Sequence, residues 1–188
     1  MQNIIGLLIV AALPLLGGCV VAAGGAVVAG GFLVAEDRRT VGTMTEDQGI
    51  ETKTSSRLDD RLRSSHINVT SYNRMVLLTG EVPNAAARDD AERIARGVDN
   101  VRGVYNELQV SGNSSLSVRS NDSYITTKVK TRFVDSQKFN PVHVKVVTES
   151  STVYLLGMVK RAEGEAASDV TRTTSGVVKV VRLFEYLD

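Results

Sequence analysis

The segment Ile67–Val82, with the sequence INVTSYNRMVLLTGEV, predicts two short β-strands joined by a tight turn. Ile67 and Val69 alternate with polar residues in the first strand, and a second apolar run closes at Gly80. The polar residues 71–74 between the two runs suit a hairpin turn. The segment Val144–Val159, VKVVTESSTVYLLGMV, aligns with the first one without a gap and shares five identical residues with it. The chain therefore contains one structural unit twice.

The repeat extends on both sides of this hairpin. Upstream, residues 47–58 align with residues 122–133, and their apolar spacing indicates that each copy begins with a helix. Downstream, the alignment continues to Leu108 and Phe184 once one residue after Ala87 is skipped, which adds a second helix and a third strand. Each copy therefore has the order helix, strand, strand, helix, strand.

This element order predicts an α+β fold with two tandem domains. The domains are expected to span residues 47–112 and 117–188, each with a small mixed three-stranded sheet packed on two helices. Residues 111–115, SGNSS, have the composition of a linker between them. Because a unit of about 65 residues buries only a marginal core, we expect the two domains to pack on each other or to lie close together.

The opening helix of the second copy carries the candidate functional face. Residues 121–135, NDSYITTKVKTRFVD, predict an amphipathic helix in which Asp122 caps the N-terminus and Ile125, Val129 and Phe133 face the core. An exposed aromatic ring between lysines suits a membrane interface, where the ring lies at headgroup level and ammonium groups meet anionic phosphates. A merely solvated helix face is the alternative. The candidate lipid-binding residues are Tyr124, Thr127, Lys128, Lys130, Thr131 and Val134.

Comparison of the two copies shows which residues of this face the fold does not require. Both opening helices share the core stripe, so the differences on their outer faces are not dictated by the fold. Residues 47–112 contain 9 basic and 10 acidic side chains, net −1, while residues 117–188 contain 11 basic and 8 acidic ones, net +3. Only the second helix is therefore expected to approach an anionic bilayer. Its counterpart in the first copy carries Thr52, Ser56, Asp59, Asp60 and Arg63.

The N-terminus is predicted to reach a membrane. The first 35 residues contain no Asp, Glu, Lys or Arg, and the apolar run 4–16 has the length of a signal-peptide core. It ends in LGGC at residues 16–19, which resembles the lipobox of bacterial lipoprotein signal peptides. The resemblance implies a signal peptide over 1–18, a lipidated Cys19 and a flexible tether over 19–46. Because the apolar character continues to residue 35, an uncleaved transmembrane anchor remains the alternative.

The sequence offers no constellation for catalysis, metal binding or a cofactor. His66 and His143 each stand just before an apolar strand, with no Cys or His partner at metal-ligand spacing. The adjacent aspartates at 59–60 and 89–90 lie on predicted helices and are interpreted as solvated surface. A net charge of +1 and the lack of Trp argue against a general nucleic-acid binder. We predict a protein that is not an enzyme and has no catalytic residues, metal or cofactor.

Two glycines are predicted to be structural. Gly80 and Gly157 close the second strand of each copy. A side chain there would obstruct the helix that crosses the strand, or the backbone needs a positive φ. Either reason makes these glycines a requirement of the fold.

The motifs LLTGEV at 77–82, LLGMV at 155–159 and the turn GVDNV at 97–101 look like those of the BON domain. Two such units behind a lipobox resemble the dual BON-domain lipoprotein family of Gram-negative bacteria over essentially the whole chain. The resemblance implies a lipid-anchored protein of the outer membrane that faces the periplasm, supports envelope integrity and gathers at division sites. It also implies binding to anionic phospholipid of the phosphatidylglycerol or cardiolipin type.

In that family the opening helix of the second unit carries the lipid contact, with an aromatic residue at the position of Tyr124. The family residue at this position is tryptophan, and tyrosine keeps an amphipathic ring but buries less area. We therefore expect somewhat weaker insertion. The alternative function is a protein-interaction adaptor that presents this face, or a sheet edge, to outer-membrane assembly machinery or a peptidoglycan-associated partner.

Overall fold

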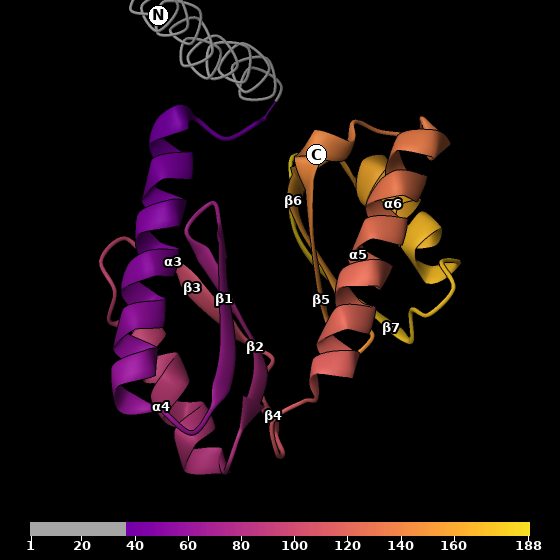
Figure 1. Cartoon of the computed structure of the whole chain (residues 1–188). Coiled ribbons are helices and arrows are strands. Elements are labelled where there is room, and N and C mark those ends of the chain that lie inside the picture. Colours follow the sequence, from indigo (N-terminus) through magenta and orange to yellow (C-terminus); the bar gives the residue numbers. More distant parts are fainter. Residues whose placement is uncertain (1–36) are drawn as a thin grey trace, which may run out of the picture. The chain divides into compact units, whose positions relative to one another are not determined.

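Two modules with the same element order make up the described part of the chain. The computed structural model describes residues 37–188, so Cys19, the predicted signal peptide and most of the predicted tether lie outside the described residues. Residues 38–188 form one compact unit, and Figure 1 shows that each of its modules places helices against a sheet.

Module 1 contains α3 (Val41–Arg61), β1 (His66–Tyr72), β2 (Met75–Val82), α4 (Ala85–Arg96), β3 (Gly103–Asn106) and β4 (Gln109–Val110). Module 2 contains α5 (Leu116–Ser136), the 3-10 turn η2 (Pro141–His143), β5 (Val144–Glu149), β6 (Thr152–Val159), α6 (Arg161–Arg172) and β7 (Lys179–Tyr186).

Each module is built on a mixed sheet, as the repeat predicts. Strand β1 runs antiparallel to β2 through the hairpin, and β2 runs parallel to β3 through the crossover helix α4. Module 2 repeats this arrangement in the order β5-β6-β7. The third strand of module 1 is interrupted at Glu107 and Leu108, so β3 and β4 pair separately with β2. The α+β class and the element order are confirmed, and module 1 has one short strand more than predicted.

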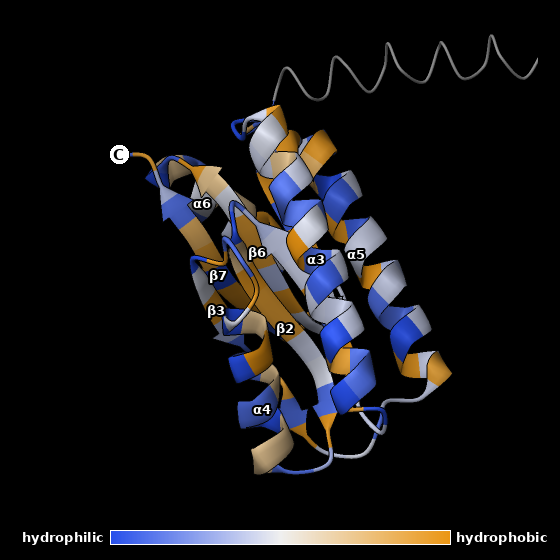
Figure 2. Cartoon of the chain, turned by 90° about the vertical axis from the view of Figure 1, so that its left-hand side faces the viewer, coloured by the Kyte–Doolittle hydropathy of each residue, from blue (hydrophilic) through white to orange (hydrophobic). Residues whose placement is uncertain are grey.

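The central strands bury both of their faces. On one face of β2, Val76 and Leu78 join Ile50 of α3 in the core of module 1. On the other face, Leu77 joins Tyr154 of β6 in a buried cluster that both modules share. A strand that is buried on both faces carries a continuous apolar run, and Figure 2 shows β2 and β6 as strongly hydrophobic strands.

The two modules contact each other through the sheet faces that their helices leave uncovered. Polar contacts accompany the apolar cluster: Lys145 Nζ lies 2.9 Å from Glu51 Oε1, and Asn73 Nδ2 donates to Glu185 Oε2 at 2.8 Å. The expectation that the two units pack on each other is therefore confirmed. The buried cluster consists of Tyr72, Leu77, Tyr154 and Leu156.

Both opening helices begin more than one turn before their predicted starts. Thr40 and Ser115 are the N-terminal caps, and their hydroxyls accept the N–H groups of Thr43 at 3.1 Å and Val118 at 3.4 Å. The prediction that Asp122 caps the helix is therefore wrong. Residues of the expected tether from 41 to 46 form the first turns of α3. Among the described residues, no helix is both long and apolar enough to cross a membrane.

Asp47 and Asp122 hold the hairpin turns instead. Asp122 is buried in the interior of α5, and its carboxylate oxygens accept the backbone N–H groups of Ser150 and Ser151 at 2.8 Å each. Asp47 accepts the two N–H groups of residues 73–74 in the same way, at 2.8 and 2.7 Å. All four turn residues have positive φ, as a two-residue type I′ hairpin turn requires. Each hairpin is thus fixed by a carboxylate from the helix that covers it.

Gly80 and Gly157 lie within β2 and β6, where the backbone of a neighbouring segment comes close. A Cβ on Gly80 would meet the carbonyl oxygen of His66 at 2.1 Å, and a Cβ on Gly157 would meet that of His143 at 2.3 Å. The obstacle is therefore neighbouring backbone and not a crossing helix, which was the first of the two predicted reasons; the second, a positive φ, holds at Gly80 alone. Gly80 also has a φ of +110°, while Gly157 is not among the positive-φ glycines. Both positions require a residue without a Cβ.

Candidate functional site

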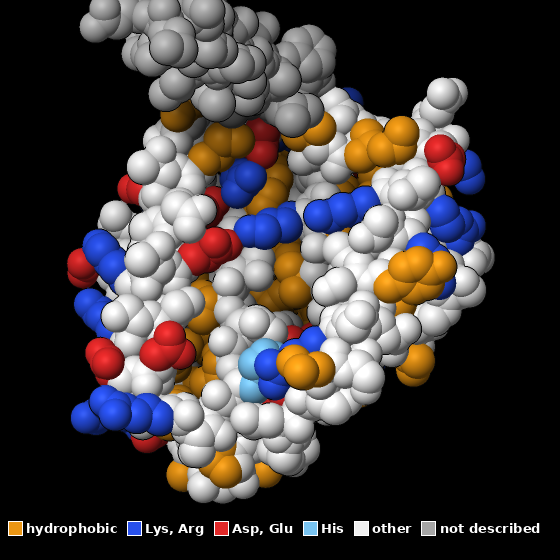
Figure 3. Space-filling model, viewed as in Figure 1, with side chains coloured by type: hydrophobic (Ala, Val, Ile, Leu, Met, Phe, Trp, Pro, Cys, Tyr) orange, Lys and Arg blue, Asp and Glu red, His pale blue; other side chains and the backbone are white. Residues whose placement is uncertain are grey.

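The outer face of α5 presents the candidate lipid-binding residues to solvent. Ile125, Val129 and Phe133 are buried, so the predicted core stripe is observed. On the opposite side, Tyr124 is 62% exposed and Val134 is 63% exposed. Figure 3, which looks onto this helix, shows Lys and Arg side chains beside exposed hydrophobic ones along it. Of the remaining candidates, Thr127, Lys130 and Thr131 are exposed and Lys128 is half-buried.

Lys128 is held by the loop that follows α6. Its Nζ donates to the Oγ of Ser175 at 2.9 Å and also to the Ser175 carbonyl oxygen. The same ammonium lies 4.7 Å from the centroid of the Tyr124 ring, which is a cation–π distance. Lys128 therefore orients the aromatic ring on the helix surface. Lys130, by contrast, makes no hydrogen bond or ion pair within the described residues, so its ammonium is available to a ligand.

A groove runs beside this face, between α5 and the loop after α6. Arg132 crosses it, because its guanidinium donates to the carbonyl oxygen of Val170 at 3.1 Å and to Thr174 Oγ1 at 2.8 Å. Phosphate oxygens accept hydrogen bonds from hydroxyl and guanidinium groups such as these. Arg132 and residues 173–175 were not among the predicted site residues, although the repeat places an arginine, Arg57, opposite Arg132 in the first copy. The groove is lined by Thr127, Lys128, Thr131, Arg132, Thr173, Thr174 and Ser175.

Helix α3 of module 1 offers no comparable face. At the positions of the tyrosine, the second lysine and the valine, it has Gly49, Ser55 and Asp59. The corresponding groove of module 1 is also basic but has no hydroxyl side chain, since it is lined by Arg57, Asp60, Arg61, Arg93, Ile94 and Gly97. The aromatic ring, the unpaired lysine and the apolar end are thus features of module 2, while the helix that carries them is common to both modules.

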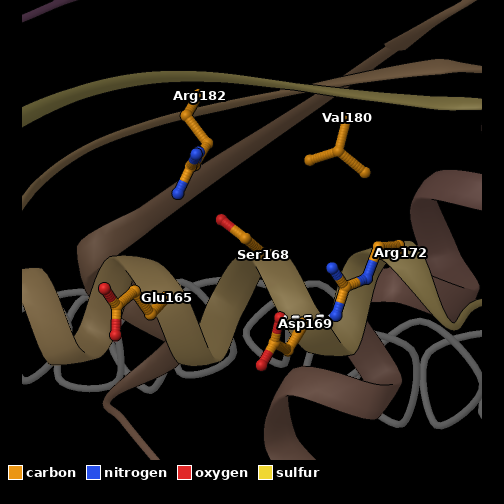
Figure 4. Close-up of a pocket in the computed structure, with 6 residues that line it drawn as sticks. All are labelled: Glu165, Ser168, Asp169, Arg172, Val180 and Arg182. Carbon is orange, nitrogen blue, oxygen red and sulfur yellow. Dashed lines mark hydrogen bonds and ion pairs between the residues drawn. The ribbon is translucent and has the colours of Figure 1, made fainter.

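A second hollow lies between α6 and the outer strand β7 (Figure 4). Charged side chains of both signs line it, and three of its six lining residues are already paired with other groups. Arg172 pairs with Asp169 at 2.9 Å, and Ser168 Oγ donates to the carbonyl oxygen of Gly164 at 2.6 Å. Its lining residues are Glu165, Ser168, Asp169, Arg172, Val180 and Arg182.

The two histidines have carboxylate partners that the sequence did not predict. His66 Nδ1 lies 3.0 Å from Glu81 Oε2, and His143 Nδ1 lies 3.7 Å from Glu163 Oε1. One partner comes from the neighbouring antiparallel strand and the other from the following helix. Spacing along the chain could not reveal either pair.

Arg38 attaches the start of the compact unit to module 2. Its guanidinium forms two hydrogen bonds with Glu163, at 2.6 and 2.9 Å, and donates to the carbonyl oxygen of Met158 at 2.8 Å. The bonds from Arg38, with that from the backbone N–H of Lys160, lower the pKa of Glu163 to about 2, although burial acts in the opposite direction. Arg38 therefore links the start of the compact unit to the module that carries the exposed α5 face.

Glu163→Gln is expected to destabilise the protein at neutral pH and to have little effect near pH 2. A carboxyl group whose folded-state pKa is lowered contributes stability above its ordinary pKa of about 4.5, and this contribution is lost as the pH falls toward 2. Urea unfolding of residues 36–188 should show a loss of about 1–2 kcal/mol at pH 7 that shrinks below pH 4.5. Glu165→Gln, an exposed position on the same helix, is the control. A difference that stays constant across this pH range would contradict the assignment.

Comparison with known proteins places both modules in one family. Residues 46–112 and residues 121–188 each match the BON domain. The chain belongs to the BON domain family and contains two copies of the domain. It is 40% identical over 176 residues to the Outer membrane lipoprotein DolP of Haemophilus influenzae (strain ATCC 51907 / DSM 11121 / KW20 / Rd), a match that covers 92% of this chain and 91% of that protein.

Two further relatives match less closely. The 21 kDa hemolysin of Actinobacillus pleuropneumoniae is 34% identical over 154 residues, which cover 80% of this chain and 79% of that protein. The Osmotically-inducible protein Y of Escherichia coli (strain K12) is 29% identical over 145 residues, with coverages of 74% and 72%. Similarity to all three proteins thus extends over most of both chains.

Proposed function

We propose that this protein is a non-enzymatic lipoprotein of the outer membrane that binds anionic phospholipid through α5 of module 2. The observation that carries the proposal is the exposed face on which Lys128 orients the ring of Tyr124, next to Lys130 and Val134. Phosphatidylglycerol or cardiolipin headgroups meet the ammonium groups, while the ring and the valine reach the boundary of the acyl chains. Module 1 keeps a lysine, Lys53, at the position of Lys128, but it lacks the ring, the second lysine and the valine, so the fold alone does not account for these three groups.

The anchor that we propose is a lipid on Cys19, at the periplasmic face of the outer membrane. Similarity over most of the chain to an outer membrane lipoprotein supports this location. Each basic residue contributes only about 1 kcal/mol at an anionic surface, and a tether makes such weak binding sufficient by raising the local concentration. In this role the protein would support envelope integrity, including at division sites. Mass spectrometry of the mature N-terminus should find an acylated Cys19, and an uncleaved N-terminus would rule the anchor out.

Tyr124→Glu and Lys130→Glu are each expected to weaken binding of residues 36–188 to phosphatidylglycerol vesicles by about tenfold. The first change removes the interfacial ring and adds a repelled charge, and the second reverses the charge of an exposed ammonium. Co-sedimentation with vesicles measures the effect. Binding should also fall as the salt concentration rises, because these exposed charges are screened.

Lys53→Glu is the matched control, since it makes the same charge change at an exposed position of α3. It should leave binding nearly unchanged. Equal pelleting with neutral phosphatidylcholine vesicles, or an equal loss from Lys53→Glu, would reject the proposed site. Crosslinking in cells from position 124 tests the adaptor function separately: protein adducts without lipid adducts would indicate an outer-membrane assembly factor or a peptidoglycan-associated partner.

A further inference from the structure

A cluster of potential metal ligands lies where the two modules meet. His66 of β1 and Glu81 of β2 are directly paired in the strand register, and Glu149 at the end of β5 approaches them from module 2. One ligand atom from each residue lies within 4.8 Å of the other two, and His66 Nδ1 is 3.0 Å from Glu81 Oε2. One imidazole nitrogen and two carboxylate oxygens at this separation can converge on a single ion.

Both carboxylates of this cluster are buried without a Lys or Arg partner among the described residues. Glu81 is 3% exposed and Glu149 is 5% exposed. Their hydrogen-bond donors other than the histidine are neutral: Asn68 Nδ2 donates to Glu149 at 2.8 Å, and the Ser114 N–H donates to Glu81 at 3.1 Å. The nearby Arg119 donates to Ser114 Oγ at 3.2 Å instead of to a carboxylate. Buried charge is costly unless an ion pair or a metal compensates it.

The opposite end of the module contact is compensated. There Lys145 Nζ lies 2.9 Å from Glu51 Oε1. A carboxylate without a basic partner is therefore not a general property of this contact. The end that carries the cluster instead gathers further negative charge. Burial raises the pKa of the Tyr154 hydroxyl to about 12, and the carboxylates of Glu107 and Glu149 contribute to the same shift. The negative charge is therefore concentrated at one end of the contact.

We propose that His66, Glu81 and Glu149 together bind one divalent transition-metal ion of the Zn²⁺ class, and that the bound ion joins module 1 to module 2. An imidazole ligand favours Zn²⁺ over Ca²⁺ or Mg²⁺, which prefer all-oxygen sites. The positive ion offsets the two buried carboxylates, and water completes its coordination. Because Glu149 is the ligand from module 2, the ion stabilises the module contact in addition to the β1–β2 hairpin.

The test uses the tag-free full chain in detergent micelles, stripped of metal with a chelator and dialysed against ZnCl₂. We expect one zinc ion per chain and a higher melting temperature with zinc than without it. His66→Ala is expected to weaken zinc binding by more than about tenfold. Glu149→Gln keeps an oxygen that can accept the hydrogen bond from Asn68 but removes the charged ligand. It should lose zinc binding to a similar extent while the circular dichroism spectrum stays native.

His143→Ala is the matched control, because this histidine occupies the equivalent position of module 2. It should retain the zinc ion. The proposal is overturned if the wild type binds no stoichiometric zinc, if His143→Ala loses zinc as His66→Ala does, or if Glu149→Gln binds zinc like the wild type. If His66→Ala does not fold, Glu149→Gln decides the question.

Discussion

Asp47→Ala is expected to lower the free energy of unfolding by about 3 kcal/mol. The carboxylate accepts hydrogen bonds from the N–H groups of Asn73 and Arg74 at 2.8 and 2.7 Å and from Ser71 Oγ at 2.6 Å. It also pairs with Arg39 at 2.9 Å. Alanine would leave these donors unsatisfied around a position that is only 3% exposed. Urea unfolding of residues 36–188 measures the loss.

Two further variants give the expected order of effects. Asp122→Ala removes an acceptor from two backbone N–H groups, so we expect a smaller loss of about 2 kcal/mol. Asp59→Ala changes an exposed aspartate of the same helix as Asp47, and it should alter the stability by less than about 0.5 kcal/mol. Equal losses from Asp47→Ala and Asp59→Ala would show that the hairpin does not depend on the buried carboxylate.

The role of these aspartates marks the limit of what the sequence could predict about the fold. The element order was predictable because the same alternation of apolar residues occurs twice. Asp122 was assigned to a helix cap because aspartate prefers that position locally, whereas its partners lie 28 and 29 residues further along the chain. Asp47 reaches its own turn over 26 and 27 residues. The sequence did contain one signal for this role. In each copy an aspartate precedes the hairpin turn at nearly the same spacing.

The candidate site was predictable as a face and not as a set of contacts. Helical spacing separated the exposed residues of α5 from its core stripe. It could not show that Lys128 turns toward Ser175, which lies 47 residues later on a different element. In the same way, Glu81 becomes a partner of His66 through the strand register, and Glu149 joins them only because the two sheets meet. Side-chain contacts between elements far apart in the sequence leave no periodic pattern from which the partners can be read.

Gly80→Ala is expected to destabilise module 1 by about 3 kcal/mol or more. The added Cβ would lie 2.1 Å from the carbonyl oxygen of His66. Because that obstacle is backbone, it can be relieved only if β1 moves away from β2. The φ of +110° adds strain for any residue with a side chain. Gly157→Ala meets a similar clash at 2.3 Å without the positive φ, so its loss should be smaller.

Gly49→Ala adds the same methyl group to the same module and is expected to have the opposite effect. Nothing lies within 4 Å of a Cβ at this helical position, and alanine favours a helix interior by up to about 1 kcal/mol over glycine. The difference in urea midpoint between the two variants therefore reports the special cost of a methyl group at Gly80, which combines the close approach of β1 to β2 with the strain of the positive φ. His66 supplies that approach and also faces Glu81, so Gly80→Ala should impair zinc binding while Gly49→Ala preserves it. If Gly80→Ala has the same urea midpoint as the wild type, β1 and β2 do not approach each other closely. The geometry that pairs His66 with Glu81 would then be wrong as well.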